Sequence, residues 1–188
     1  MQMKSGWGRQ SPCRGVTLIE TLVVVVLLSL CAMAATPSWF AWSVRDQVEG
    51  RANALLGTLA YARNEAIRQR VRITVCRIDA ARRCLAAGKV CPSGASDWSC
   101  GWAVMAGGSG AQRLLRFQSG FDGISVISPL SSIAFTPPAG RAAGTFGSFE
   151  IAPRKTTAAT SGARWRRCIR IASAGRARMT EGACVSAS

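Results

Sequence analysis

The sequence contains no histidine among its 188 residues. This absence excludes Ser-His-Asp and Cys-His nucleophilic sites, as well as metal sites built on imidazole ligands. Acidic residues are also scarce, because Asp and Glu together number 9 and most stand alone in the chain. General acid–base catalysis would have to depend on these few carboxylates. We therefore expect a protein that is not an enzyme and that holds no cofactor and no metal ion.

The scarcity of acids leaves a large excess of positive charge. Lys and Arg together number 24, so the formal net charge at pH 7 is +15. Hydrophobic residues make up 48% of the chain, which is too many for a disordered protein. The length suits one folded domain with attached segments. The composition thus indicates a folded, basic protein whose binding partners carry negative charge.

The N-terminus consists of a basic segment followed by an apolar run. Residues 1–15 contain Lys4, Arg9 and Arg14 and no acid, and residues 16–35 carry a single charge, Glu20. A helix of this length spans about 30 Å, which is one hydrocarbon core of a bilayer. Positive charge ahead of the run favours a cytoplasmic start, with the rest of the chain on the other side of the membrane.

Two ordinary interpretations of this segment leave Glu20 unexplained. One is a secretory signal with Ala32-Met33-Ala34 as its cleavage site, and the other is a plain single-span anchor. A carboxylate near the start of an apolar run is costly, and such residues are functional by default. Gly15 lies at the junction between the basic segment and the apolar run, which favours a third interpretation.

The segment Arg14-Gly15-Val16-Thr17-Leu18-Ile19-Glu20 resembles the prepilin cleavage site of type IV pilins and type II secretion pseudopilins. The resemblance implies that prepilin peptidase cuts after Gly15 and that the new N-terminal residue, Val16, is N-methylated, although Phe is commoner there. It also implies that Glu20 pairs with the N-terminal amine of a neighbouring subunit during fibre assembly. Before assembly the protein would be a single-pass inner-membrane protein with a periplasmic domain, and afterwards part of a pilus at the cell surface.

Beyond the apolar run, the spacing of hydrophobic residues predicts that the helix continues. Apolar side chains recur at helical intervals from Val44 to Ile67, with polar residues between them. We expect one helix from about residue 17 to residue 70, with residues 16–36 as its transmembrane and assembly half and residues 37–71 as its amphipathic half. Residues 72–188 are expected to form a β-rich domain. Its predicted strands are 72–76, 102–105, 114–117, 124–127, 132–135, 146–151 and 168–171.

A second resemblance lies in the order of several short motifs. Leu59–Ile67 leads into the strand that ends at Cys76, and Asp97–Trp102 and Ile133–Phe135 follow, as in the GspH/FimT family of minor pseudopilins and minor pilins. The resemblance extends from residue 15 to about residue 180. It implies an α+β fold of the type IV pilin kind, in which a long N-terminal helix packs on an antiparallel β-sheet domain. The aromatic side chains within these motifs are expected to be core residues.

Six of the 8 cysteines follow the apolar run: Cys76, Cys84, Cys91, Cys100, Cys168 and Cys184. An even number in an exported domain predicts disulfide bonds. Zinc is disfavoured because these cysteines form no C-x-x-C pair and the chain has no histidine. The pairing stays open on sequence grounds, and the local hypothesis joins the cysteines nearest to one another: Cys76–Cys84, Cys91–Cys100 and Cys168–Cys184.

The C-terminal third of the chain is rich in arginine. The basic residues between positions 154 and 178 are Arg154, Lys155, Arg164, Arg166, Arg167, Arg170, Arg176 and Arg178. Such a cluster predicts a surface for a polyanion, which could be DNA, acidic lipid headgroups or acidic polysaccharide. A solvated face that only aids solubility is the alternative. If residues 176–178 are extended, Arg176 and Arg178 point the same way and can contact neighbouring phosphates.

Gly175, Arg176 and Arg178 resemble the Gly-Arg-x-Arg motif of FimT-type minor pilins, in which the motif binds DNA and supports uptake during natural transformation. The resemblance implies a minor type IV pilin that assembles with other major and minor pilins and binds DNA without sequence preference. Further basic residues are expected to assist: Arg170, Arg167, Arg154 and Lys155. The alternative is a GspH-type pseudopilin, a structural subunit of the type II secretion system, because the N-terminal motif is common to both.

Overall fold

The computed structural model describes residues 15–91, 97–108, 112–143 and 147–184, and of residues 34–38 the backbone alone. The chain divides into two units, residues 1–40 and residues 41–188. Except for Gly15, the predicted leader peptide lies outside the described residues.

A single helix, α1, runs from Leu18 to Gln69, close to the predicted range. The hydroxyl oxygen of Thr17 caps its start by accepting a hydrogen bond from the backbone N–H of Glu20, with an N···O distance of 3.3 Å. Glu20 lies in the first turn, where the positive end of the helix dipole favours a carboxylate. No helix within the described residues is long and apolar enough to cross a membrane. The membrane assignment of residues 16–36 stays a prediction.

Within the second unit, α1 buries one face. Residues spaced three and four apart along this face are at most 1% exposed, which is the amphipathic pattern predicted for this half of the helix. They are Val48, Ala52, Leu55, Leu59, Ala62 and Ala66.

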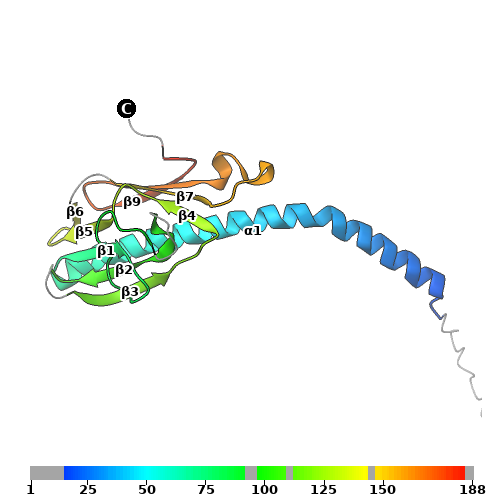
Figure 1. Ribbon diagram of the computed structural model, residues 1–188, viewed down its shortest axis with the longest axis horizontal. Helices are drawn as coiled ribbons and strands as arrows, with labels where there is room; N and C mark the ends of the chain where they lie inside the picture. The colour runs from blue at the N-terminus through cyan, green and yellow to red at the C-terminus, as the bar shows by residue number, and fades with distance from the viewer. Residues whose placement is uncertain (1–14, 92–96, 109–111, 144–146, 185–188) are drawn as a thin grey trace, which may run out of the picture. The chain divides into compact units, whose positions relative to one another are not determined.

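Two antiparallel sheets pack with this part of α1 (Figure 1). The first has the order β3-β2-β1-β5-β6, and the second has the order β4-β7-β8-β9. The strands of the first sheet are β1 (Ile73–Arg77), β2 (Gly101–Ala106), β3 (Arg113–Ser119), β5 (Ser132–Thr136) and β6 (Arg141–Ala143). Those of the second are β4 (Ile124–Ile127), β7 (Ser148–Pro153), β8 (Arg167–Ile171) and β9 (Ala177–Glu181). The described residues also include three short 3₁₀ turns, at Trp98–Cys100, Ala158–Thr160 and Ala163–Trp165.

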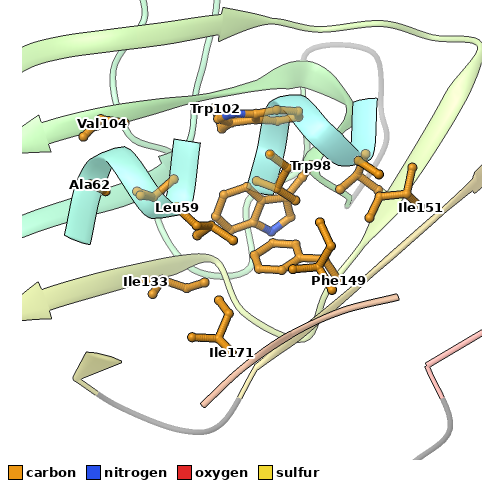
Figure 2. Close-up of a cluster of buried hydrophobic side chains, with 14 of the residues drawn as sticks. Leu59, Ala62, Trp98, Trp102, Val104, Ile133, Phe149, Ile151 and Ile171 are labelled. Atoms are coloured by element: carbon orange, nitrogen blue, oxygen red, sulfur yellow. The ribbon is translucent and has the colours of Figure 1, made fainter. Parts of the chain in front are cut away.

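One hydrophobic core joins the helix to both sheets, and Trp98 lies within it (Figure 2). The Trp98 ring meets Phe149 of β7 edge-on, with ring centroids 4.8 Å apart, and its Nε1 donates a hydrogen bond to the Leu130 carbonyl oxygen at 2.7 Å. Trp102 of β2 is also buried, and its Nε1 donates to the Thr58 hydroxyl of α1 at 3.1 Å. Because both indole N–H groups have acceptors, these large rings are buried without an unpaired donor. Trp98 and Trp102 are therefore core residues, as expected, whereas Tyr61 is half-buried and packs against this core.

Three disulfides connect Cys76 with Cys84, Cys91 with Cys100 and Cys168 with Cys184. These are the pairs of the local hypothesis. Among the described residues, Cys31 is a free, exposed cysteine.

Candidate polyanion-binding site

The candidate site is built on the hairpin formed by β8 and β9. The two strands pair antiparallel, with Arg170 opposite Arg178 and Ile171 opposite Ala177. The connecting turn is closed by two backbone hydrogen bonds, from Gly175 N–H to the Ala172 carbonyl at 2.8 Å and from Ala172 N–H to the Arg176 carbonyl at 2.9 Å. Gly175 has a φ of 76°, which glycine adopts without strain. The turn therefore requires the glycine of the Gly-Arg-x-Arg segment.

Three arginines project from this hairpin on one side. Arg176 and Arg178 are exposed and Ala177 between them is half-buried, so the two arginines alternate with it and share a face. Arg170 is exposed on the neighbouring strand, directly across from Arg178. All three line a surface hollow of about 530 Å³, together with Ile171, Ala172, Ala174 and Thr180.

The charges around this hollow repel one another. Like charges directly opposite on paired strands destabilise a sheet, and Arg170 and Arg178 occupy such positions. Among the described residues, neither Arg176 nor Arg178 forms an ion pair with a carboxylate. A bound anion would remove this repulsion, and the planar guanidinium group is suited to bidentate contact with phosphate.

Arg167 does not belong to this surface, contrary to the sequence-based expectation. Its side chain is 6% exposed, and its Nε donates to the carboxylate of Glu49 on α1 at 2.7 Å. One terminal nitrogen donates to the carbonyl oxygens of Arg164 and Arg166, at 3.0 and 2.8 Å. The carboxylate of Glu181 lies 3.9 Å away. Arg167 therefore joins the second sheet to the helix and is not available to an external ligand.

Arg154 and Lys155 are also separated from the hairpin. They follow the end of β7, and the register of β7 with β8 pairs Ser148 with Arg170, so residues beyond Pro153 lie at the opposite end of the sheet. A ligand in the hollow does not need to reach them. Lys155 is exposed there.

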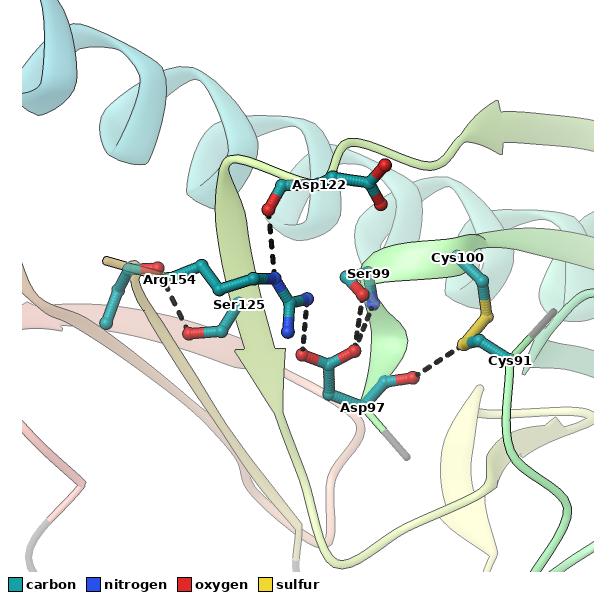
Figure 3. Close-up of polar contacts among 8 residues, drawn as sticks. Cys91, Asp97, Ser99, Cys100, Asp122, Ser125 and Arg154 are labelled. Carbon is teal, nitrogen blue, oxygen red and sulfur yellow. Dashed lines mark hydrogen bonds and ion pairs between the residues drawn. A yellow bond between two sulfur atoms is a disulfide. The ribbon is translucent and has the colours of Figure 1, made fainter. Parts of the chain in front are cut away.

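Arg154 is held by contacts within the protein (Figure 3). It donates to the Asp97 carboxylate at 3.0 Å and to the Asp122 carbonyl oxygen at 2.9 Å. Asp97 also accepts from the backbone N–H of Ser99 at 3.0 Å, so this carboxylate caps the short turn that begins at Trp98. Arg154 thus helps to hold the segment that carries the central tryptophan.

Arg166 is another basic residue of the cluster with an acidic partner, Glu150, at 2.6 Å. Acidic side chains therefore neutralise Arg154, Arg166 and Arg167, whereas Arg176 and Arg178 have no acidic partner among the described residues. This division was not visible in the sequence, because each acidic partner comes from a distant strand, turn or helix.

The N-terminal motif residues are exposed in the structure. Gly15 and Val16 precede the helix, and Glu20 is exposed in its first turn. A Cβ placed on Gly15 would meet no atom within 4 Å. Packing within the described part of the chain therefore does not account for glycine at this position.

Comparison with known proteins places the chain in a class and then in a family. Its fold, with a long N-terminal helix and antiparallel sheets, is similar to crystal structures of the type IV minor pilin FimU of Pseudomonas aeruginosa. One such structure has a TM-score of 0.53 and 23% identity, covering 73% of this chain and 99% of that chain. Another has a TM-score of 0.55 and 22% identity, covering 75% and 97%. This likeness defines a minor-pilin-like α+β fold.

The family follows from two sequence matches. Residues 51–175 match the type II transport protein GspH family, and residues 10–36 match the prokaryotic N-terminal methylation motif. Because the first match covers more than half of the chain, the protein belongs to the GspH family. No curated protein matches the chain.

Proposed function

We propose that this chain is a minor type IV pilin of the FimT kind, which joins a pilus and binds extracellular DNA for uptake in natural transformation. Binding is directed to phosphates and is independent of sequence. Arg170, Arg176 and Arg178 make the contacts, and Gly175 shapes the turn between them. Arg167 and Arg154 hold the fold, and Lys155 lies outside the contact surface.

The observation that carries this proposal is the concentration of like charge on one hairpin. Three arginines line the same hollow, two of them directly across a strand pair. Arg176 and Arg178 have no acidic partner among the described residues, and the phosphate groups of a nucleic acid backbone would supply the missing negative charge. A surface that only aids solubility does not need positive charges placed so close together, since it is served as well by dispersed charge of both signs.

The N-terminal motif supports the assembly part of the proposal. Among the described residues no atom lies where a Gly15 Cβ would be, so packing there does not require glycine, as expected if another protein, the prepilin peptidase, selects it. Cleavage after Gly15 makes Val16 the methylated N-terminus. Glu20 then pairs with a neighbouring subunit's amine, because the apolar helix favours a neutralised pair. Residues 16–36 hold the protein in the inner membrane until the fibre incorporates it.

The test is a DNA titration of the full chain, oxidised and kept in an uncharged detergent. A labelled random-sequence duplex is titrated at several NaCl concentrations, with fluorescence anisotropy as the readout. R176Q/R178Q is expected to weaken binding at least tenfold and to make the slope of log K against log salt concentration shallower by about 2. The matched control, R45Q/K89Q, removes the same charge from exposed positions on α1 and beside Gly88, and should bind nearly as the wild type does.

Two outcomes contradict the proposal. If the wild-type chain does not bind DNA, the hairpin is not a DNA site. If both double variants lose affinity equally, the attraction is a property of net charge alone. Either result would favour a structural subunit of the type II secretion system, the function after which the matched family is named.

A further inference from the structure

The tip of the β8–β9 hairpin packs against the turn between β5 and β6. A Cβ placed on Gly175 would collide with the carbonyl oxygen of Gly140, in the turn between β5 and β6. Gly140 is itself confined, because a Cβ there would lie 2.7 Å from the Arg63 Cγ and 3.1 Å from the Arg63 carbonyl oxygen. The two glycines thus let the hairpin tip, the β5–β6 turn and α1 approach at backbone distance.

Arg63 of α1 joins the same two turns through its guanidinium group. Its Nε donates to the Ala174 carbonyl oxygen of the hairpin tip, and one terminal nitrogen donates to the Ala139 carbonyl oxygen of the β5–β6 turn, both at 3.3 Å. These contacts span 111 and 76 residues of sequence. The planar guanidinium presents several N–H donors in a fixed arrangement and can bond two acceptors at once. A lysine ammonium lacks this planar arrangement of donors.

The contact of Gly175 with Gly140 is next in the chain to residues that line the proposed DNA site. Ala174 and Arg176 both line the hollow, and they flank Gly175 in the chain. Arg63 directs its hydrogen bonds to carbonyl oxygens of the turns, so its part is to hold the loop in place. An arginine side chain gains affinity for phosphate when its backbone is already ordered, because less conformational freedom is lost on binding.

We infer that Arg63 is a positioning residue for DNA binding, which acts by clamping the hairpin tip onto the β5–β6 turn through the Gly140–Gly175 contact. The inference rests on the proposed function of the hairpin arginines. It adds a residue of the helix, distant in sequence from the Gly-Arg-x-Arg segment, to the machinery that shapes the site.

Two variants break the contacts that Arg63 and Gly175 make between the hairpin tip and the β5–β6 turn, without changing the charge of the protein. R63K keeps the positive charge but loses the fork that joins the two carbonyl oxygens. G175A places a methyl group against the Gly140 carbonyl and strains a residue with φ of 76°. The matched control is R141Q, which removes one exposed positive charge from the residue next to Gly140 and leaves the contacts of Arg63 and Gly175 in place.

The first readout is DNA affinity, measured on the full chain in uncharged detergent as above. R63K and G175A are expected to weaken binding about tenfold, the effect of ordering a few side chains of the site. R141Q should cost less than either. In the R176Q/R178Q background, R63K should cause little further loss, because the residues through which Arg63 acts are gone.

The second readout is amide hydrogen exchange, which does not depend on DNA. The Ala172 and Gly175 amides close the turn, and their protection should fall about tenfold in R63K and G175A. Protection in the β7–β8 pairing should stay at the wild-type level, which separates a loosened tip from a generally destabilised domain. R141Q should leave the exchange of all these amides unchanged.

The outcomes are distinguishable. If the wild type does not bind DNA, the proposed function fails and this inference fails with it. If the wild type binds DNA but R63K binds equally well, or if the exchange of the tip amides is unchanged in R63K, the inference fails alone. Weaker binding by R63K in the R176Q/R178Q background, to the same degree as in the wild type, would also overturn it.

Discussion

Replacing Arg167 with glutamine removes an ion pair between the second sheet and α1. The Arg167 side chain is 6% exposed and donates three hydrogen bonds, one to the Glu49 carboxylate and two to backbone carbonyl oxygens. A glutamine side chain is shorter and uncharged, so it cannot reproduce all three. The change therefore leaves part of these three acceptors without their donor.

The expected cost follows from the burial of the two partners. Removing one partner of a buried ion pair costs about 3–5 kcal/mol. The Glu49 side chain is 39% exposed and regains water when Arg167 is lost, so the cost should be near the lower end, about 3 kcal/mol. For a domain of this size, 1 kcal/mol lowers Tm by roughly 2–4 °C, which gives a fall of about 6–12 °C for R167Q.

Thermal unfolding of the full chain in uncharged detergent, followed by tryptophan fluorescence, measures this cost. The matched control is R178Q, an exposed substitution on the adjacent strand that should change stability by less than about 0.5 kcal/mol. The two variants should behave in opposite ways in DNA binding. Below its Tm, R167Q should bind as the wild type does, whereas R178Q should bind more weakly while remaining stable.

Two results would refute this reasoning. A Tm of R167Q within about 2 °C of the wild type would mean that the Glu49–Arg167 pair does not connect the helix to the sheet energetically. A loss of DNA affinity in folded R167Q as large as that in R178Q would mean that Arg167 contacts DNA.

The remaining predictions concern the disulfide at the hairpin and the response to acid. C168S/C184S removes a crosslink between residues 16 apart in sequence and should lower the free energy of unfolding by about 3 kcal/mol in urea titrations; an unchanged unfolding midpoint would contradict this. The hydrogen bonds from Arg68 and Gln69 lower the pKa of Glu65 below its ordinary 4.5. The stability that this carboxylate contributes is present above pH 4.5 and is lost as pH falls through the lowered pKa, so E65Q should show a weaker loss of stability in acid than the wild type.

The sequence predicted those features that depend on neighbours along the chain. The helical spacing of apolar residues marked α1 to within a residue at each end. Strong alternation of β-branched and aromatic residues marked most of the strands. The missed strands, β6 and β9, are Arg141–Ala143 and Ala177–Glu181, where alanine and arginine give little hydrophobic alternation. These two edge strands form because their partners β5 and β8 offer unpaired backbone groups.

The candidate site could be predicted only in part, because charge in a sequence does not show which charges are paired. Arg167 meets Glu49 across 118 residues, and Arg154 meets Asp97 across 57 residues. No local pattern indicates these partners. The turn at Gly175–Arg178, by contrast, is closed by hydrogen bonds within the hairpin. Its local conformation could therefore be predicted from the motif.

The disulfide pattern has a consequence for biogenesis. The six cysteines of the second unit pair in consecutive order, the first with the second, the third with the fourth and the fifth with the sixth. If a chain crosses a membrane from its N-terminal side and is oxidised as it emerges, each cysteine meets its native partner before any later cysteine has appeared. The short separations of 8, 9 and 16 residues keep the entropy cost of each closure low. Oxidation in the order of emergence therefore produces the native set directly, and the domain should mature without a disulfide isomerase.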